Sequence, residues 1–291
     1  MVNDLPVEFY SLSDHEAQRT YVGVRRAEKW VGFFLPHLRP GMSLLDCGCG
    51  VGSITLDLAE RVAPGLVTGI DMDERQLVFA REGARERGLT NVTFQQGNIY
   101  TLEFDGESFD AVLARTVLFH LSDPLRALKE IRRMLKPGGV AAVSDDEWHT
   151  MVYSPAHPLM EKIIGLWTRA IQFNGGNPFY SRHLRGLMLE AGFARSEGHA
   201  IAADYYGSLE ETRRMAGIQT RLFHDPDLRG VDPGPGPGHA GGTRRDVKLV
   251  PGLGRTPGRL PGDHVLRGPR LDRLTSGPAL LAFGRQERRR S

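Results

Sequence analysis

Between residues 42 and 146, short apolar runs alternate with longer segments in which apolar residues recur every three or four positions. The short runs are typical of buried strands, and the longer segments of helices with one buried face. This alternation predicts a parallel sheet wound on both faces. The predicted strands are 42–46, 66–70, 92–95, 110–114 and 139–144, and the predicted helices are 53–62, 74–88, 124–135 and a short turn near 117–121.

The flanking segments also carry structural signals. Residues 8–38 are predicted to be helical up to the proline and glycine that precede the first strand. After the sheet core we expect helices over 158–173 and 180–191, then a strand from 192 to about 206. The predicted parts of the chain are an N-terminal helical segment (1–40), a main domain (41–224) and a tail (225–291).

A glycine-rich loop joins the first predicted strand to the first helix, in a D-x-G-x-G-x-G pattern made by Asp46, Gly48, Gly50 and Gly52. Glycine tolerates positive φ and lets a ligand approach closely, so we expect bare backbone N–H groups here, next to a helix N-terminus. Asp71 ends the second strand, where a carboxylate can bind both ribose hydroxyls. A dinucleotide-binding dehydrogenase would need glycine where this chain has Ser53, which argues against that class.

With these features, residues 10 to 224 resemble the class I S-adenosylmethionine-dependent methyltransferases. The resemblance implies an α/β fold with a doubly wound, mostly parallel, seven-stranded Rossmann-like sheet, and S-adenosyl-L-methionine as cofactor. It also implies that residues 1–40 act as a lid over the cofactor and the acceptor pocket, which makes Tyr10, Arg19 and Tyr21 candidates to reach either one. The candidate cofactor-binding residues are Asp46, Gly48, Gly50, Gly52, Asp71, Met72, Asn98, Ile99 and Arg115.

Several of these roles have alternatives that the sequence leaves open. Met72 lies against the adenine or fills the core, and Arg115 pairs the cofactor carboxylate or a surface acid. Asn98 stands where the family usually has an aspartate that accepts from the adenine amino group, so this contact is expected in a weaker form. The backbone N–H of Ile99 is expected to donate to a ring nitrogen of the adenine. His120 is a general base or a structural histidine of the family's V-L-x-H-L-x-D turn. No catalytic residue is assigned.

Three acids, Asp145, Asp146 and Glu147, follow the fifth predicted strand. Catechol-type methyltransferases hold a metal ion with an acid at this place and an Asp-Asn pair on a later strand. No such pair is found at a matching place, so no metal is predicted. The acids are interpreted as solvated loop residues, with Trp148 lining the acceptor pocket.

Aromatic residues beyond position 150 predict an apolar acceptor cavity, or alternatively the packing of the second sheet edge. They are Trp167, Phe173, Phe179, Tyr180, Tyr205 and Tyr206. The expected function is methyl transfer to a small apolar or aromatic metabolite of secondary or quinone-type metabolism. Carbon methylation of a prenyl or terpenoid olefin and a non-catalytic cofactor-binding module are the alternatives.

Composition narrows the partners further. The 291 residues are 40% hydrophobic, with a formal net charge of +2, so no basic surface argues for nucleic acid. No apolar run is long enough to span a membrane, and the N-terminus does not read as a signal peptide. We therefore expect a cytoplasmic enzyme with a small-molecule acceptor, without nucleic-acid or membrane partners; a homo-oligomer stays open.

The tail from about residue 225 is rich in Gly, Pro and Arg and lacks hydrophobic periodicity. This composition predicts disorder and disruption of the C-terminal sheet edge. Two interpretations stay open: a flexible basic extension, or a shifted reading frame over about 228 to 275. Residues 279–287 again resemble the closing strand of the family.

Overall fold

A seven-stranded sheet, in the order β3-β2-β1-β4-β5-β7-β6, organises the chain. The computed structural model describes residues 20–154, 156–201, 208–223 and 279–285. Strands β1 to β5 pair in parallel, whereas β7 is antiparallel to both β5 and β6. The prediction of a doubly wound, mostly parallel α/β sheet is confirmed. The strands are β1 (Leu44–Cys47), β2 (Val67–Asp71), β3 (Val92–Gln96), β4 (Phe109–Arg115), β5 (Leu135–Asp146), β6 (Arg195–Ile201) and β7 (Ala279–Arg285).

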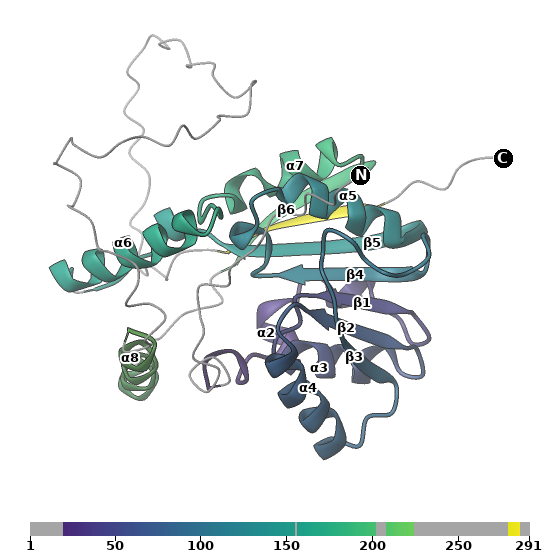
Figure 1. Ribbon diagram of the computed structural model, residues 1–291, viewed down its shortest axis with the longest axis horizontal. Helices are drawn as coiled ribbons and strands as arrows, with labels where there is room; N and C mark the ends of the chain where they lie inside the picture. The colour runs from purple at the N-terminus through teal and green to yellow at the C-terminus, as the bar shows by residue number, and fades with distance from the viewer. Residues whose placement is uncertain (1–19, 155, 202–207, 224–278, 286–291) are drawn as a thin grey trace, which may run out of the picture. The chain divides into compact units, whose positions relative to one another are not determined.

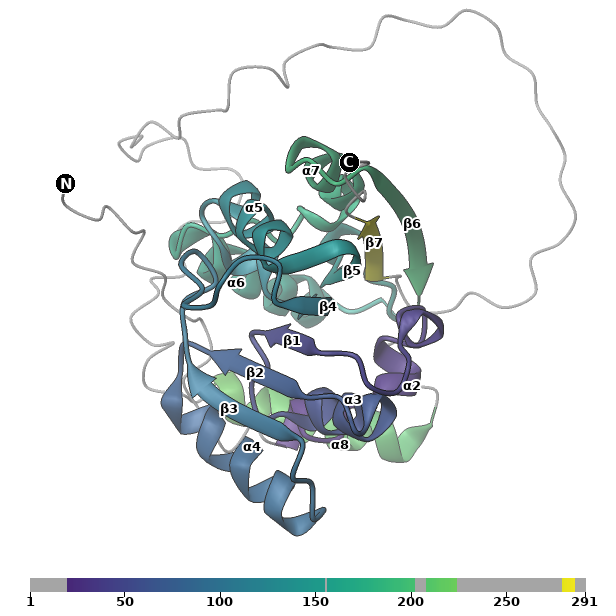
Figure 2. The ribbon, with the colours of Figure 1, turned by 90° about the vertical axis from the view of Figure 1, so that its right-hand side faces the viewer.

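Helices cover both faces of this sheet (Figures 1 and 2). α2 and α3 pack on one face, with Leu44 and Leu113 of the sheet. α5 and α7 pack on the other face, with Leu45 and Val112. Burial on both faces explains why these strands read as continuous apolar runs. The helices are α2 (Ala27–Trp30), α3 (Ser53–Val62), α4 (Glu74–Glu86), α5 (Pro124–Met134), α6 (Pro158–Phe173), α7 (Leu184–Glu190) and α8 (Leu209–Phe223), with 3-10 turns at Leu35–His37, Leu118–His120, Trp148–Thr150 and Ser181–His183.

The N-terminal segment differs from the continuous helix predicted over 8–38. In its described part, a helical turn at 20–22 is followed by extended backbone at Arg26, the four-residue α2 and a 3-10 turn. Two contacts hold this broken path: the Ser53 hydroxyl donates to the carbonyl of Val22 (2.7 Å), and the N–H of Ala27 donates to Asp57 (2.9 Å). Tertiary hydrogen bonds to α3 therefore replace helical ones.

The C-terminal edge is paired over the described residues. β7 forms seven residue pairs with β5 and seven with β6, so residues 279–285 take the place of the expected closing strand. The paired edge does not show the disruption expected there, whereas residues 224–278, the subject of the disorder and reading-frame hypotheses, lie outside the described residues. β6 ends at Ile201, and residues 202–207 also lie outside them.

Helices α6 and α8 meet near the carboxyl ends of the strands. Trp167 of α6 packs with Met215 and Ile218 of α8, and Tyr21 and Trp148 join this cluster. Among the helices that the structure describes, none is both long and apolar enough to cross a bilayer.

Candidate active site

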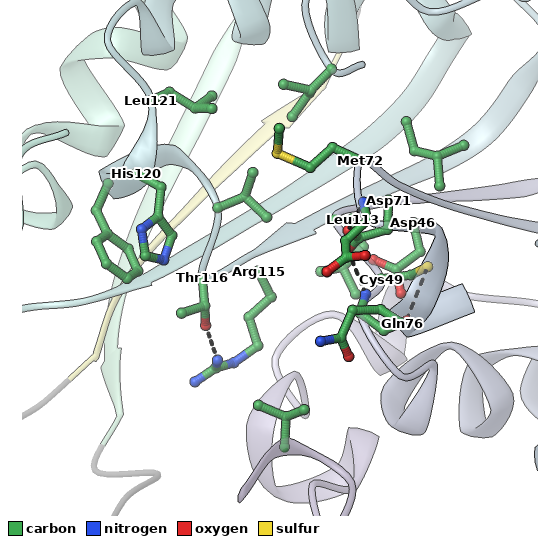
Figure 3. A pocket seen from close by; sticks show the side chains of 18 of the residues that line it. Asp46, Cys49, Asp71, Met72, Gln76, Leu113, Arg115, Thr116, His120 and Leu121 are labelled. Atoms are coloured by element: carbon green, nitrogen blue, oxygen red, sulfur yellow. Dashed lines mark hydrogen bonds between the residues drawn. The ribbon is translucent and has the colours of Figure 1, made fainter. Parts of the chain in front are cut away.

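A cavity of about 250 Å³ lies at the carboxyl ends of the parallel strands (Figure 3). This is the rim where open α/β sheets bind ligands. Eight of the nine predicted cofactor-binding residues line the cavity. They are Asp46, Gly48, Gly50, Asp71, Met72, Asn98, Ile99 and Arg115.

Asp71, at the end of β2, is fixed by the backbone around it. Its Oδ2 accepts from the N–H of Gly50 (2.8 Å), and its Oδ1 accepts from the N–H of Asp73 (2.9 Å). Burial raises the pKa of Asp71, while these two N–H groups act in the opposite direction. Each oxygen keeps a second lone pair, so the carboxylate can still accept from two hydroxyls in the cavity.

The glycine loop does not offer the bare N–H groups that the sequence predicted. The N–H groups of Gly48 and Cys49 both donate to the carbonyl of Ile70 (2.8 and 2.9 Å). That of Gly50 donates to Asp71, and that of Gly52 to the carbonyl of Cys49 (3.0 Å). The expectation was wrong for these four N–H groups, because three of them bind residues of β2 and the fourth closes the loop, so the glycines supply conformation and space.

Gly52 is the predicted residue that does not line the cavity. Its φ is +75°, and an added Cβ would lie 2.8 Å from the Cβ of Ala80 and 3.1 Å from the ring of Phe94. It therefore permits α3 to pack against α4 and β3. Gly50 has a φ of +54° and lines the cavity, and a Cβ added there would have no heavy atom of the described residues within 4 Å beyond its chain neighbours.

Asp46 is buried beneath the loop. Its Oδ2 accepts from the hydroxyl of Thr55 (2.6 Å). Burial raises the pKa of Asp46 to about 7, and the nearby charge of Asp71 adds to this rise, against the Thr55 hydrogen bond. A cationic ligand group in the cavity would stabilise the ionised form of this carboxyl.

The β3 end of the cavity carries Asn98, Ile99 and Met72. The Oδ1 of Asn98 accepts from the N–H of Tyr100 (2.9 Å), so the oxygen expected to face a ligand already closes a local turn. Met72 is 47% exposed, which argues against the alternative that it fills the core.

Arg115, at the end of β4, is 6% exposed and pairs with Asp146 at 3.3 Å. Its guanidinium lies 4.3 Å from the centre of the Trp30 ring. Arg25, which sequence reasoning did not single out, is equally buried, lines the same cavity and lies 4.5 Å from that ring. Nothing in the sequence distinguishes Arg25 from its exposed neighbour Arg26, because only the break before α2 turns one of them inward.

The three acids are not the solvated loop residues that were predicted, because Asp145 and Asp146 end β5 and only Asp146 is partly exposed. Asp145 is fully buried: its Oδ1 accepts from the N–H of Val117 (2.9 Å), and its Oδ2 has no hydrogen-bond partner among the described residues. Burial raises the pKa of Asp145 to about 7, and Asp146 adds to this effect. Glu147 is buried and paired with Arg182. Across the described residues, no group of three or more His, Cys, Asp or Glu side chains is placed to hold a metal ion.

The turn that follows β4, residues 116–121, forms part of the cavity lining. Thr116, also not anticipated, has φ of +59°, an uncommon conformation for a β-branched residue. His120 follows on the same turn, with its ring 4.0 Å from that of Phe119. Burial lowers the pKa of His120 to about 4, against an upward effect of Asp146. The imidazole is therefore neutral at physiological pH.

The aromatic residues predicted to form an acceptor cavity divide into two groups. Trp167, Trp148 and Tyr21 line the cavity. Phe173 is 78% exposed, and Phe179 and Tyr180 do not belong to the lining. Tyr10, Arg19, Tyr205 and Tyr206 lie outside the described residues.

Comparison with known proteins identifies the family of this chain. The family model described as "Methyltransferase domain" matches residues 38–174. An uncharacterized methyltransferase of Schizosaccharomyces pombe is 31% identical over 205 residues, which cover 68% of this chain and 72% of that protein. A demethylmenaquinone methyltransferase of Staphylococcus epidermidis is 31% identical over 196 residues, or 60% of this chain and 79% of that protein.

A solved structure shares the fold. It is the phosphoethanolamine N-methyltransferase 2 of Haemonchus contortus, in complex with phosphomonomethylethanolamine and S-adenosylhomocysteine. The TM-score is 0.50 at 16% identity, over 86% of this chain and 50% of that one. The chain belongs to the class I S-adenosylmethionine-dependent methyltransferases. It is an enzyme of that family, and its cofactor is S-adenosyl-L-methionine.

The residues at the cavity fit this cofactor. Along the rim, four strands lie side by side in the order β3, β2, β1 and β4. At the usual spacing between neighbouring strands, β3 and β4 are about 14 Å apart. Asp71 offers acceptors for a diol, Gly50 leaves space beside it, and the buried carboxyl of Asp46 suits a cationic group. A nucleoside joined to a charged amino acid matches this order of groups.

Proposed function

We propose that this enzyme methylates a small apolar molecule with an aromatic ring, and that hydroquinones are its preferred acceptors. The observation that carries the proposal is the lining of the cavity beyond Arg115, which is largely apolar and aromatic. Its apolar and aromatic members include Phe119, Leu121, Trp148, Trp167 and Ile171, and its polar members are Thr116, His120 and Asp146. Such surroundings suit a flat apolar ring with few polar groups.

The chemistry of methyl transfer and the relatives support the hydroquinone class. When bound, S-adenosylmethionine supplies an electrophilic methyl group, so the acceptor must be electron-rich. A reduced quinone ring satisfies this requirement, whereas the oxidised ring does not. Demethylmenaquinone methyltransferases are among the relatives, for example that of Lactococcus lactis, at 34% identity over 154 residues and 61% of its length.

Residues of the chain divide between the two ligands in this proposal. Asp71 binds the ribose hydroxyls, the segment at Asn98 and Ile99 contacts the adenine, and Arg115 binds the carboxylate. The apolar wall orients the acceptor ring and excludes water, which can supply much of the rate without a strong base.

His120 is placed to handle the acceptor proton. Since its pKa of about 4 keeps the imidazole neutral, one ring nitrogen can accept a hydrogen bond from an acceptor hydroxyl. The acceptor has to lose one proton when it gains the methyl group, and His120 would take up this proton and release it to solvent. With a pKa of about 4, His120 is a weak general base, so alignment of the acceptor has to supply most of the rate.

The proposal is tested by methyl transfer from labelled cofactor to defined acceptors. The panel contains a short-chain demethylmenaquinol, a simple phenol, a prenyl olefin and an aliphatic amine. We expect transfer to the hydroquinone, and Trp167→Ala should raise its KM about ten-fold because the aromatic contact is lost. Phe173→Ala is the matched control, since this aromatic residue lies on the same helix but is 78% exposed.

Binding of S-adenosylhomocysteine separates acceptor effects from cofactor effects. Its affinity should be unchanged in Trp167→Ala and Phe173→Ala, and strongly reduced in Asp71→Ala. Transfer only to the amine, or a Trp167→Ala variant with an unchanged acceptor KM, would contradict the proposal. Preferential transfer to the prenyl olefin would instead favour carbon methylation of a terpenoid.

A further inference from the structure

Two buried arginines reach the cavity from distant parts of the chain. Arg25 precedes α2, Arg115 ends β4, and each is 6% exposed. Their guanidinium carbons lie 4.5 and 4.3 Å from the centre of the same Trp30 ring, and that of Arg25 also lies 4.9 Å from the ring of Tyr21. These aromatic contacts offset part of the cost of burying two cations and restrict the guanidinium planes.

Most of the acids that line the cavity lie at the ends of β1 and β2, whereas Asp146 lies beside the guanidinium of Arg115 and pairs with it. In Figure 3, Asp46 and Asp71 form one group with Gln76, and Arg115 lies apart from them beside Thr116. A ligand that carries separate positive and negative charges matches this division. The amino acid arm of S-adenosylmethionine is such a group, because it carries an ammonium and a carboxylate.

We propose that Arg25 binds the carboxylate of this arm together with Arg115, and that Trp30 holds the two guanidinium groups as a clamp. Each guanidinium presents a planar fork of N–H donors that matches a carboxylate. The stacking on Trp30 fixes both forks before the ligand arrives, so less conformational entropy is lost on binding. The inference concerns the cofactor and does not depend on the proposed acceptor.

Two ligands that differ in the amino acid arm test the clamp in the full-length protein. S-adenosylhomocysteine carries the carboxylate, whereas 5′-methylthioadenosine keeps the nucleoside and the sulfur but lacks the arm. Calorimetric titrations with both ligands are compared in Arg25→Met, Arg25→Lys and a control, Lys29→Met. Lys29 is a suitable control because its ammonium lies 6.0 Å from the same ring but outside the cavity lining.

Arg25→Met should weaken the binding of S-adenosylhomocysteine about ten-fold or more, since a charge-assisted pair is lost. Its affinity for 5′-methylthioadenosine should stay within about two-fold of the unchanged protein, which also shows that the variant is folded. The affinity of Arg25→Lys for S-adenosylhomocysteine should lie between those of the parent and Arg25→Met, because lysine keeps the charge but lacks the planar fork of donors. The affinities of Lys29→Met should equal those of the parent. If Arg25→Met does not fold, Arg25→Lys carries the comparison.

Other outcomes would overturn the assignment. If Arg25→Met loses affinity equally for both ligands, Arg25 only shapes the pocket. If its affinity for S-adenosylhomocysteine is unchanged, Arg25 does not bind the carboxylate. Benzoate, titrated in the presence of S-adenosylhomocysteine, serves as a model acidic acceptor. Loss of benzoate binding alone in Arg25→Met would place the clamp on an acidic acceptor.

Discussion

Carboxyl groups at three strand ends behave differently because their surroundings differ. Asp71 accepts two backbone hydrogen bonds at the cavity, Asp46 lies buried beneath the glycine loop, and Asp145 is enclosed within the sheet. The residue type is the same in each case. Burial and nearby donors decide which of them can ionise readily, and this depends on elements far apart in the sequence.

At Asp46 the consequence is a pH-dependent cofactor affinity. With a pKa of about 7, this carboxyl is protonated below neutral pH, whereas the ammonium of the ligand favours its ionised form. Binding below pH 7 then requires the loss of a proton, so affinity should rise up to about ten-fold per pH unit until pH 7 and level off above it.

Titration of S-adenosylhomocysteine between pH 5.5 and 8.5 measures this slope. Asp46→Asn should flatten it, because the amide cannot ionise but still offers an oxygen to the hydroxyl of Thr55. If the affinity of Asp46→Asn changes with pH as steeply as that of the parent, the proton lost on binding comes from another group.

At the scale of elements, the glycine loop shows how one motif serves two purposes. Gly50 and Gly52 both have positive φ, at +54° and +75°. The first borders open space at the cavity, and the second touches α4 and β3. The motif alone predicts the backbone conformation of both positions, but only the packing of the helices separates a ligand-facing glycine from a structural one.

This difference predicts opposite outcomes for two otherwise equal substitutions. Gly52→Ala should destabilise the fold by about 2 to 4 kcal/mol, from positive-φ strain together with the contact to Ala80. Gly50→Ala should cost only the strain of about 1 kcal/mol but reduce S-adenosylhomocysteine affinity, since its Cβ enters the ligand space.

Urea unfolding and calorimetry measure the two effects side by side. Equal loss of stability in Gly50→Ala and Gly52→Ala would refute the distinction.

At the scale of the whole molecule, Asp145 links the sheet to the site. It lies where β5 pairs with β7, opposite Leu280, and its Oδ1 holds the N–H of Val117 in the turn that carries His120. The burial that positions this turn also raises the pKa of Asp145 to about 7.

The global stability should therefore depend on the protonation of Asp145. An unfolded aspartate titrates at its ordinary pKa of 3.8, so between pH 3.8 and 7 the folded state binds more protons and stability falls as pH rises. From pH 5 to pH 8, the parent should lose about 1 to 3 kcal/mol more than Asp145→Asn, whose neutral side chain cannot ionise.

Urea unfolding at both pH values provides the comparison, with the exposed Asp105→Asn as the control. The opposite slope that arises from His120 is common to all variants and cancels in the difference. Parallel pH curves for the parent and Asp145→Asn would contradict the role of burial.

The sequence by itself determined the alternation of strands and helices between residues 42 and 146, the glycine loop and the position of Asp71 at a strand end, but not helix α8. These features follow from local periodicity and spacing, which act within a few neighbouring residues. Tertiary structure alone decided that Arg25 turns inward beside Trp30, that the loop N–H groups bind Ile70, and that Asp145 is buried. Each of these depends on contacts between segments far apart in the chain, whose burial and electrostatic effects no local pattern records.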